Sequence, residues 1–189
     1  MLASSALVHG DRPGDHVGED DPLRPAALAR PAAAAEDALR GPGTRIVRLG
    51  WVYGPTGMLS AVVRGLMGSR YRIIGDGANR MPLISADDAA AAMRAALELP
   101  AGAHAAAEED VPTQKELVHA ICAELGALRP DHIPPRLASL SFGGPLAEAV
   151  RTSVQLVPGR LAAAGWRPAR DWRRDLVSSV RPPAGSAPA

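Results

Sequence analysis

TRIVRLGWVYGPTG, residues 44–57, is the stretch that decides the fold. In its first half, β-branched and other apolar residues alternate with arginines, which is the pattern of a β-strand. A strand is therefore expected over 44–50, and the glycines and the proline of 51–57 predict a turn that closes it. The elements on either side determine what kind of sheet this strand enters.

Upstream, a short strand and a helix are predicted. Residues 2–9, LASSALVH, have the pattern of a short buried strand that ends in a polar turn. A long acidic loop rich in Gly, Pro and Asp follows. LARPAAAAEDALR, residues 28–40, lies in a helix expected over about 26–40, because alanine has the highest helix propensity and the GPG after it stops the helix.

Downstream, strands and helices continue to alternate. Residues 58–68 are apolar at helical spacing, and YRIIGDGANR predicts a strand that runs into a turn. MPLISADDAAAAMRAALELP predicts a strand and then a helix, and Ser85 with Asp88 forms the capping box that marks the helix start. Thr113 and Glu116 mark the start of another helix in the same way.

The last third is less regular, with a short strand, broken helices and a final amphipathic helix, DWRRDLVSSV. The alternation in the first part predicts an α/β fold with a parallel sheet, and the helix-rich end predicts a smaller lobe packed against it. We expect residues 1–110 to form the sheet domain with interleaved segments of the second lobe. Residues 111–180 are expected to form the helix-rich lobe, and 181–189 a disordered tail.

Composition excludes several classes of protein. The chain has 189 residues, of which 47% are hydrophobic and 22% charged, as in globular proteins that bury a core. A net charge of +1 gives no footprint for nucleic acid or acidic lipid, and no run is apolar enough to span a membrane. The start lacks the pattern of a signal peptide, so a cytoplasmic location is expected. The single Cys122 excludes an internal disulfide and is expected to be buried.

Two groups of polar residues are given structural interpretations. Asp87 and Asp88 are neighbours at a helix start and do not share a face, so capping and the helix dipole explain them better than acid/base chemistry. The histidines show no metal-binding spacing, and no metal site is predicted. They are His9, His16, His104, His119 and His132.

Three segments carry a resemblance: RIVRLGWVYGPTG, IIGDGANRMPLISADDAAAAMRAALE and VPTQKELVHAICAELG. Their order and separation resemble those of the NAD(P)-dependent epimerase/dehydratase family, the extended short-chain dehydrogenases/reductases, over roughly residues 2–178. The resemblance implies a Rossmann-like region with a helix-rich C-terminal substrate lobe. It also implies NAD or NADP as cofactor and a small hydroxy, keto or sugar-type compound as substrate.

The same resemblance implies that the chain starts late. Family members open with a strand, a G-x-x-G-x-x-G turn and a helix, whose backbone amides hold the cofactor pyrophosphate. Nothing in this sequence matches that arrangement, and GPG at 41–43 and GDG at 75–77 are predicted to be turns. Residues 1–9 correspond to the family's mid-sheet strand instead. We therefore expect a partial Rossmann-like sheet from which the N-terminal βαβ units are missing.

By the same resemblance, the helix at 28–40 corresponds to the family's catalytic helix, which carries Tyr-x-x-x-Lys followed by small residues and a glutamate. Aligning Glu36 with that glutamate places Leu28 at the tyrosine position and Ala32 at the lysine position. Neither side chain transfers a proton. The pair does not occur elsewhere in the sequence, because the two tyrosines and the only lysine do not have this spacing. These residues are Tyr53, Tyr71 and Lys115. In the family this helix also takes part in a dimer interface.

Other site residues are implied one by one. Ser5 matches the catalytic Ser/Thr, and a strand-end serine without a catalytic role is the alternative. Tyr53 and Arg80 are expected to contact the substrate; the alternatives are a ring packed beneath a turn for Tyr53 and a solvated loop for Arg80. Cofactor contacts are implied for the residues after the central strand, Gly50, Trp51 and Val52.

The substrate class is narrowed by two departures from the family's pattern. Trp51 stands where nucleotide-sugar enzymes carry an asparagine, and Met81 stands near the place of a phosphate-binding arginine. Both favour the members that take smaller or less charged substrates.

Three hypotheses remain open. The first is an N-terminally shortened NAD(P)-dependent oxidoreductase or epimerase that does not turn over alone. The second is a non-catalytic module that holds a small molecule, or pairs with a second copy or with a complete homologue. The third is a fragment without an independent role.

Overall fold

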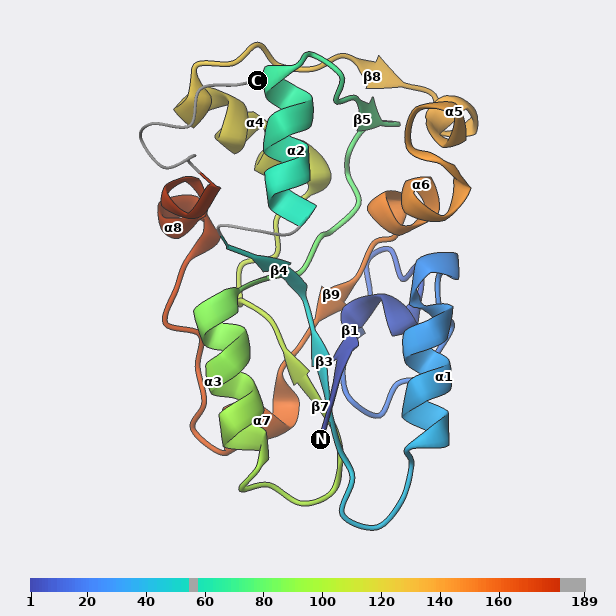
Figure 1. The fold of residues 1–189 in the computed structure, drawn as a ribbon, viewed down its shortest axis with the longest axis vertical. Coiled ribbons are helices and arrows are strands. Elements are labelled where there is room, and N and C mark those ends of the chain that lie inside the picture. The colour runs from blue at the N-terminus through green and yellow to red at the C-terminus, as the bar shows by residue number, and fades with distance from the viewer. Residues whose placement is uncertain (55–57, 181–189) are drawn as a thin grey trace.

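The computed structural model describes residues 1–54 and 58–180. A parallel sheet runs through the lower part of the molecule in Figure 1, with β3 at its centre. Its strands are β1 (Leu2–Ser5), β3 (Arg45–Leu49) and β7 (Gly102–Ala106). One face is covered by α1 (Arg30–Ala38), and the other by α3 (Ala86–Ala96) and α7 (Gly159–Ala163).

The upper part of the molecule is mostly helical (Figure 1). It contains α2 (Met58–Met67), α4 (Gln114–Leu125), α5 (Ala138–Phe142), α6 (Gly144–Arg151), α8 (Trp172–Val180), β5 (Ile73–Ile74) and β8 (His132–Ile133). The two-stranded pairs β4 (Trp51–Tyr53) with β6 (Leu83–Ser85), and β2 (His16–Val17) with β9 (Gln155–Leu156), lie closer to the sheet. Short 3-10 helices are η1 (Ala6–His9), η2 (Ala27–Ala29) and η3 (Pro135–Leu137). None of the helices in the described ranges is long and apolar enough to cross a membrane.

The register of the sheet places polar side chains of two strands together. β1 pairs with β3 in parallel, so that Ser4 lies opposite Arg48, and β3 pairs with β7 in parallel, so that Val47 lies opposite His104. Side chains alternate between the two faces along a strand. Val47 accordingly packs against α3, whereas Arg48 points to the face that α1 covers.

Several elements predicted from the sequence are confirmed. The strand expected at 44–50 is β3, and the alanine run forms η2 and α1. At the start of α3, the Ser85 hydroxyl accepts the Asp88 amide at 3.0 Å. The Thr113 hydroxyl accepts the Glu116 amide at 3.1 Å, and the Glu116 carboxylate accepts the Thr113 amide at 2.8 Å. Cys122 is buried, as expected.

Other predictions are wrong in part. The strand expected over 2–9 ends at Ser5, because the Ser5 hydroxyl accepts the Leu7 amide and starts η1. The first residues of the expected turn at 51–57 form β4, which pairs with β6. No strand was expected at β7, whose sequence GAHAA has weak β propensity and is a strand because it pairs with β3. The predicted tail at 181–189 lies outside the described residues.

A buried ion pair fastens α1 to the sheet. Glu36 is 0% exposed and Arg48 5% exposed, and the Arg48 Nη2 donates to Glu36 Oε2 at 2.8 Å while its Nε donates to Oε1 at 3.1 Å. Ser4 Oγ donates to the same Oε1 at 2.5 Å. The Arg48 Nη1 donates to the Glu19 carbonyl at 2.8 Å. One carboxylate on α1 thus joins β1 and β3 from the same side.

Replacing Glu36 with leucine should leave the Arg48 guanidinium buried without its counter-charge. We expect the free energy of unfolding to fall by about 3–5 kcal/mol, as measured by urea denaturation. The double variant Glu36→Leu/Arg48→Met should recover most of that loss, because neither charge then remains. Asp37→Ala, on the exposed side of the same helix, is the matched control and should have little effect. An undiminished loss in the double variant would contradict this role of the pair.

Candidate functional site

The carboxyl ends of β1 and β3 lie side by side, next to the start of α1. The border of the sheet formed by these strand ends is called the carboxyl edge below, and it differs from the outer sides of β1 and β7. In open parallel sheets, ligands bind in the crevice outside these strand ends. Ser5 is the last residue of β1, and Gly50 to Val52 follow β3 directly. The structure therefore brings the sequence-derived residues Ser5, Gly50 and Trp51 to the same edge.

Ser5 is held in a structural contact. Its backbone is extended, and its hydroxyl accepts the Leu7 amide at 3.2 Å as the cap of η1. The hydroxyl proton remains available for a second acceptor, because the cap uses only a lone pair. The cap is compatible with the substrate contact predicted for Ser5, which remains a prediction.

The positions assigned to the acid/base pair face this edge without proton-transferring groups. Leu28 lies in η2 and is 47% exposed. Ala32 lies one turn further on, in α1, and packs against the cluster of Leu7, Val8 and Ala29. The chain's tyrosines and lysine lie elsewhere: Tyr53 in β4, Tyr71 beside α4 and Lys115 on α4.

Gly50 is required by a close approach of two backbones. A Cβ atom there would lie 2.7 Å from the Pro82 carbonyl oxygen. The Gly50 amide donates to the Ala106 carbonyl at 2.9 Å, and the Trp51 amide donates to the Pro82 carbonyl at 2.6 Å. Gly50 thus lets the chain leave β3 and enter β4.

Trp51 and Val52 differ in how open they are. The Trp51 ring is half-buried and packs against the cluster of Leu7, Val8, Ala29 and Ala149, and its Nε1 is buried without a hydrogen-bond partner among the described residues. Val52 is 38% exposed. Of the cofactor contacts implied by the resemblance, Val52 is the most open to solvent, and all three remain predictions.

The two residues expected to contact the substrate are engaged with the protein. Tyr53 is 1% exposed and lies in a hydrophobic cluster with Leu83 and Trp172. The Arg80 Nη1 donates to the Val111 carbonyl at 2.7 Å and lies 3.8 Å from Glu116. A substrate would reach Tyr53 only after the covering residues move.

Two buried titratable residues near this edge were not singled out in the sequence. His9 lies behind Ser5, is 0% exposed, and accepts from Arg48 Nη1 at 3.4 Å through Nε2. Burial, and after it the Arg48 guanidinium, lower the pKa of His9 to about 4, so the imidazole is neutral. Glu108 follows β7 and is buried beside Tyr53. Neither position carries a local motif, because each is defined by partners distant in sequence.

A cavity of about 820 Å³ opens at another part of the sheet. It is lined by the acidic loop at Glu19 to Asp21, the segment at the amino end of β7, and Arg40, His104 and Arg160. The amino end of β7 is opposite to the strand ends that hold Ser5 and Gly50, so this cavity is distinct from the candidate site.

Comparison with solved structures gives close matches of fold. The human epimerase family protein SDR39U1 (isoform 2), solved with NADPH, matches with a TM-score of 0.78 and 22% identity over 95% of this chain and 64% of that one. A dTDP-glucose 4,6-dehydratase from Bacillus anthracis, solved with NAD, has a TM-score of 0.72 and 18% identity over 95% and 59%. The UDP-glucose 4-epimerase of Thermus thermophilus, solved with NAD, has a TM-score of 0.66 and 23% identity over 95% and 61%.

The chain has the fold of the NAD(P)-dependent epimerases and dehydratases. This confirms the α/β fold and the partial Rossmann-like sheet predicted from the sequence. The chain spans about 60% of the length of the solved chains quoted above. No protein-family model matches it, and no curated protein does.

The described glycines at positions 10, 41, 43, 50 and 77 do not form a site for the pyrophosphate of a nicotinamide dinucleotide. Such a site needs a glycine turn between a strand and a helix, open to the ligand. The glycines with close backbone approaches, Gly10, Gly50 and Gly77, approach segments of this chain at Arg24, Pro82 and Lys115. Gly41 and Gly43 are open but lie between α1 and β3, where a strand follows.

Substituting Gly50 with alanine should drive a Cβ into the Pro82 carbonyl. The free energy of unfolding should fall by about 1–3 kcal/mol, because the backbones must separate or lose the Trp51 hydrogen bond. Chemical denaturation measures this, and Gly41→Ala, where the added Cβ has nothing within 4 Å, is the control. Equal stability of the two variants would show that the approach at Gly50 is not a constraint.

Proposed function

We propose that this chain is a relative of the NAD(P)-dependent epimerases and dehydratases that keeps a small-molecule site, and that it neither binds the nicotinamide cofactor nor carries out hydride transfer with its own residues. The fold supports the first part. The second part rests on α1: its Glu36 is in place as a structural residue, while Leu28 and Ala32 stand where the resemblance puts the tyrosine and the lysine. A leucine and an alanine neither donate nor accept a proton.

The role that remains is to bind a small hydroxy, keto or sugar-type compound at the carboxyl edge of the sheet. Two observations support a compound with little negative charge. Met81, near the family's phosphate-binding arginine, is 7% exposed and part of the core, and Arg80 beside it is held by Val111 and Glu116. Among the described residues around Met81, the Arg80 guanidinium is thus engaged within the protein and is not presented to a diphosphate.

A thermal-shift titration of the purified chain with NAD, NADH, NADP and NADPH tests this proposal. We expect a cooperative melt whose midpoint does not move with any of the four, because a ligand raises it only by binding the folded state. A complete UDP-glucose 4-epimerase is the positive control and should be stabilised by NAD. A saturable rise for this chain would contradict the proposal and return it to the cofactor-dependent enzymes.

A second candidate function is pairing with another polypeptide, and the two edges of the sheet favour it. At the β7 edge, Glu19 Oε1 accepts the Ala105 amide at 3.3 Å and Arg160 Nη1 donates to the Ala103 carbonyl at 2.7 Å. Side chains that bond to an edge strand prevent further pairing. At the outer edge of β1, no such contact occurs among the described residues.

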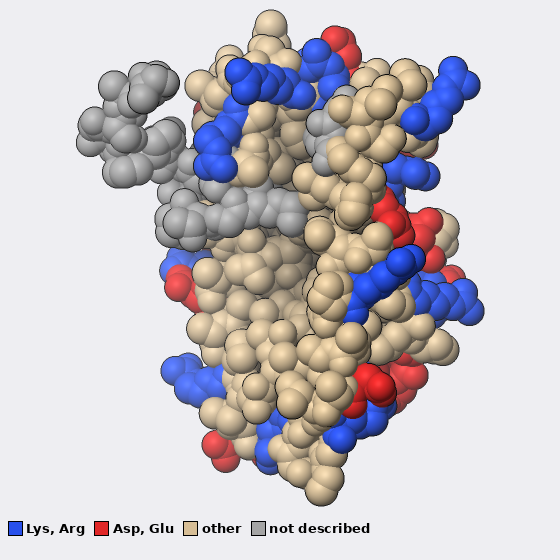
Figure 2. Space-filling model, turned by 45° about the vertical axis from the view of Figure 1, so that its right-hand side comes forward, with Lys and Arg blue, Asp and Glu red and all other residues tan. Residues whose placement is uncertain are grey.

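The surface around β1 is also uncharged. The β1 sequence LASS has neither charge nor proline, and Met1 and Leu28 nearby are 49% and 47% exposed. Figure 2, turned toward α1, shows a wide area without Lys, Arg, Asp or Glu in the lower half of the molecule. We propose that this edge pairs with a second copy of the chain; a complete homologue is the other partner to test.

Ala3→Lys places a charge on the exposed side of β1 and should weaken pairing. Sedimentation equilibrium over a concentration series should show self-association of the wild type and a dissociation constant raised at least about tenfold in the variant. Leu128→Lys, at a residue 89% exposed in the upper part, is the control and should behave as wild type. A wild type that stays monomeric, alone and with a homologue, would contradict pairing.

A further inference from the structure

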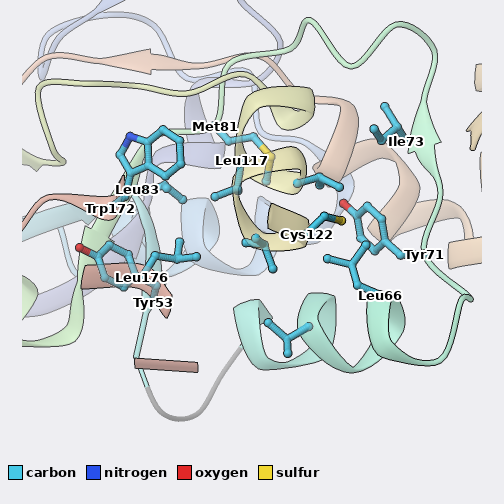
Figure 3. Close-up of a cluster of buried hydrophobic side chains, with 13 residues drawn as sticks. Tyr53, Leu66, Tyr71, Ile73, Met81, Leu83, Leu117, Cys122, Trp172 and Leu176 are labelled. Carbon is cyan, nitrogen blue, oxygen red and sulfur yellow. The ribbon is translucent and has the colours of Figure 1, made fainter. Parts of the chain in front are cut away.

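Residues 169–176 form a segment, here called the strap, that crosses from the lower to the upper part of the molecule and enters α8. Its Trp172 and Leu176 are each 1% exposed. They lie beside Tyr53 and Leu83 in the hydrophobic cluster of Figure 3. The strap therefore closes one side of the core that β4 enters.

Carboxylates hold the backbone of the strap in place. Asp88, at the start of α3, accepts the amides of Ala169 and Arg170 at 2.9 and 3.0 Å. Glu108, after β7, accepts the Trp172 amide through Oε2 at 2.8 Å. These two carboxyl groups are 4% and 3% exposed.

A second layer of contacts lies nearer the surface. Asp110 Oδ2 accepts the Trp172 indole Nε1 at 3.0 Å and the Arg173 Nε at 2.9 Å. The Arg173 guanidinium stacks 4.4 Å above the Trp172 ring. Asp87 accepts the Arg170 Nη2 at 3.1 Å. Asp110 and Asp87 thus have cationic partners.

Glu108 differs from these carboxylates because its contacts supply no positive charge. Its buried Oε1 and the neighbouring Tyr53 hydroxyl have no other hydrogen-bond partner among the described residues, and this hydroxyl lowers the pKa of Glu108. The groups that act on Glu108 are Tyr53 from β4, Asp88 from α3, and Asp171 with the Trp172 amide from the strap. A buried carboxylate without a counter-charge is costly, and the two aspartates increase the cost.

We propose that the strap is a proton-controlled latch. It is held closed most firmly at a pH where Glu108 is protonated in both the closed and the open form, and the hold weakens at a pH where Glu108 ionises on opening. In the closed form the neutral carboxyl accepts the Trp172 amide and stays buried. In the open form the carboxylate reaches water, which the closed form denies it. Rising pH thus favours opening.

The pH range follows from the environment of Glu108. Burial is the main cause that raises the pKa of Glu108 from 4.5 to about 7 in the closed form. Below about pH 4.5 both forms are protonated, and the latch has its full strength. Between pH 4.5 and about 7 the open form is ionised while the closed form is not, so opening becomes steadily easier; above about 7 the effect is constant.

Opening the strap would change the candidate site, since both share one strand. β4 starts at Trp51, immediately after Gly50, and its Tyr53 is covered by Trp172 and Leu176. Release of the strap would expose the Tyr53 hydroxyl and free this end of β4. The latch does not depend on the proposed function, because it is defined by contacts within the chain.

Amide hydrogen exchange at Trp172 tests the latch, because this amide is the donor to Glu108. After correction for intrinsic exchange, its protection factor in the intact chain should fall on the order of a hundredfold between pH 4.5 and 7 and then level off. Glu108→Gln should remove this dependence, since an amide side chain does not titrate. Glu109→Gln, at the adjacent residue outside the latch, should keep the wild-type profile.

If Glu108→Gln does not fold, a variant that leaves Glu108 itself in place still tests the latch. Tyr53→Phe removes a hydroxyl that lowers the pKa of Glu108, so the fall in protection should extend to higher pH than in wild type. A wild-type profile independent of pH would overturn the proposal. So would a pH dependence that survives in folded Glu108→Gln, or a profile that Tyr53→Phe leaves unshifted.

Discussion

The buried carboxylate of Glu36 is the contact on which the arrangement of the sheet depends. It receives the Arg48 guanidinium from β3 and the Ser4 hydroxyl from β1, so both strands and α1 share one 0%-exposed group. Without Glu36 the buried Arg48 guanidinium would have no counter-charge, and another register of β1 against β3 would remove the Ser4 hydroxyl from the same carboxylate. The pair therefore specifies one packing of α1. Arg48 also donates to the Glu19 carbonyl and so holds the acidic loop in place. The Glu19 side chain in turn bonds to the β7 edge.

The segment that contains α1 keeps its structural glutamate but lacks the residues expected to transfer protons. Glu36 keeps α1 against the sheet, while the positions where the resemblance expects proton transfer carry Leu28, in η2, and Ala32, in the first turn of α1. A fold does not carry an activity with it; the residues of the site do. The likeness to epimerases and dehydratases is therefore a likeness of fold and carries no activity to this chain by itself. Glu19 and Arg160 bond to the β7 edge, whereas no such contact covers the β1 edge among the described residues; this contrast is the basis of the pairing proposed above.

Local patterns predicted a large part of this structure. The alternation in β3 and the side-chain caps at Ser85 and Thr113 are interactions within a few residues, and each was found correctly. β7 was missed because GAHAA becomes a strand only by pairing with β3, whose residues Arg45 to Leu49 each lie 57 positions earlier in the chain than their partners. His9 and Glu108 were missed as titratable groups for the same reason. Their environments come from Arg48, Tyr53 and Trp172, which no local pattern connects to them.

Native-state hydrogen exchange on β1, β3 and α1 tests most directly whether Glu36 and Arg48 unite them. If they do, the protected amides of the three elements should open together, with a single free energy close to that of global unfolding. Glu36→Leu should lower that free energy for all three by the same amount. The account would be contradicted if β1 and α1 opened independently, at a much lower free energy, while β3 stayed protected. In that case the sheet would not depend on the buried pair.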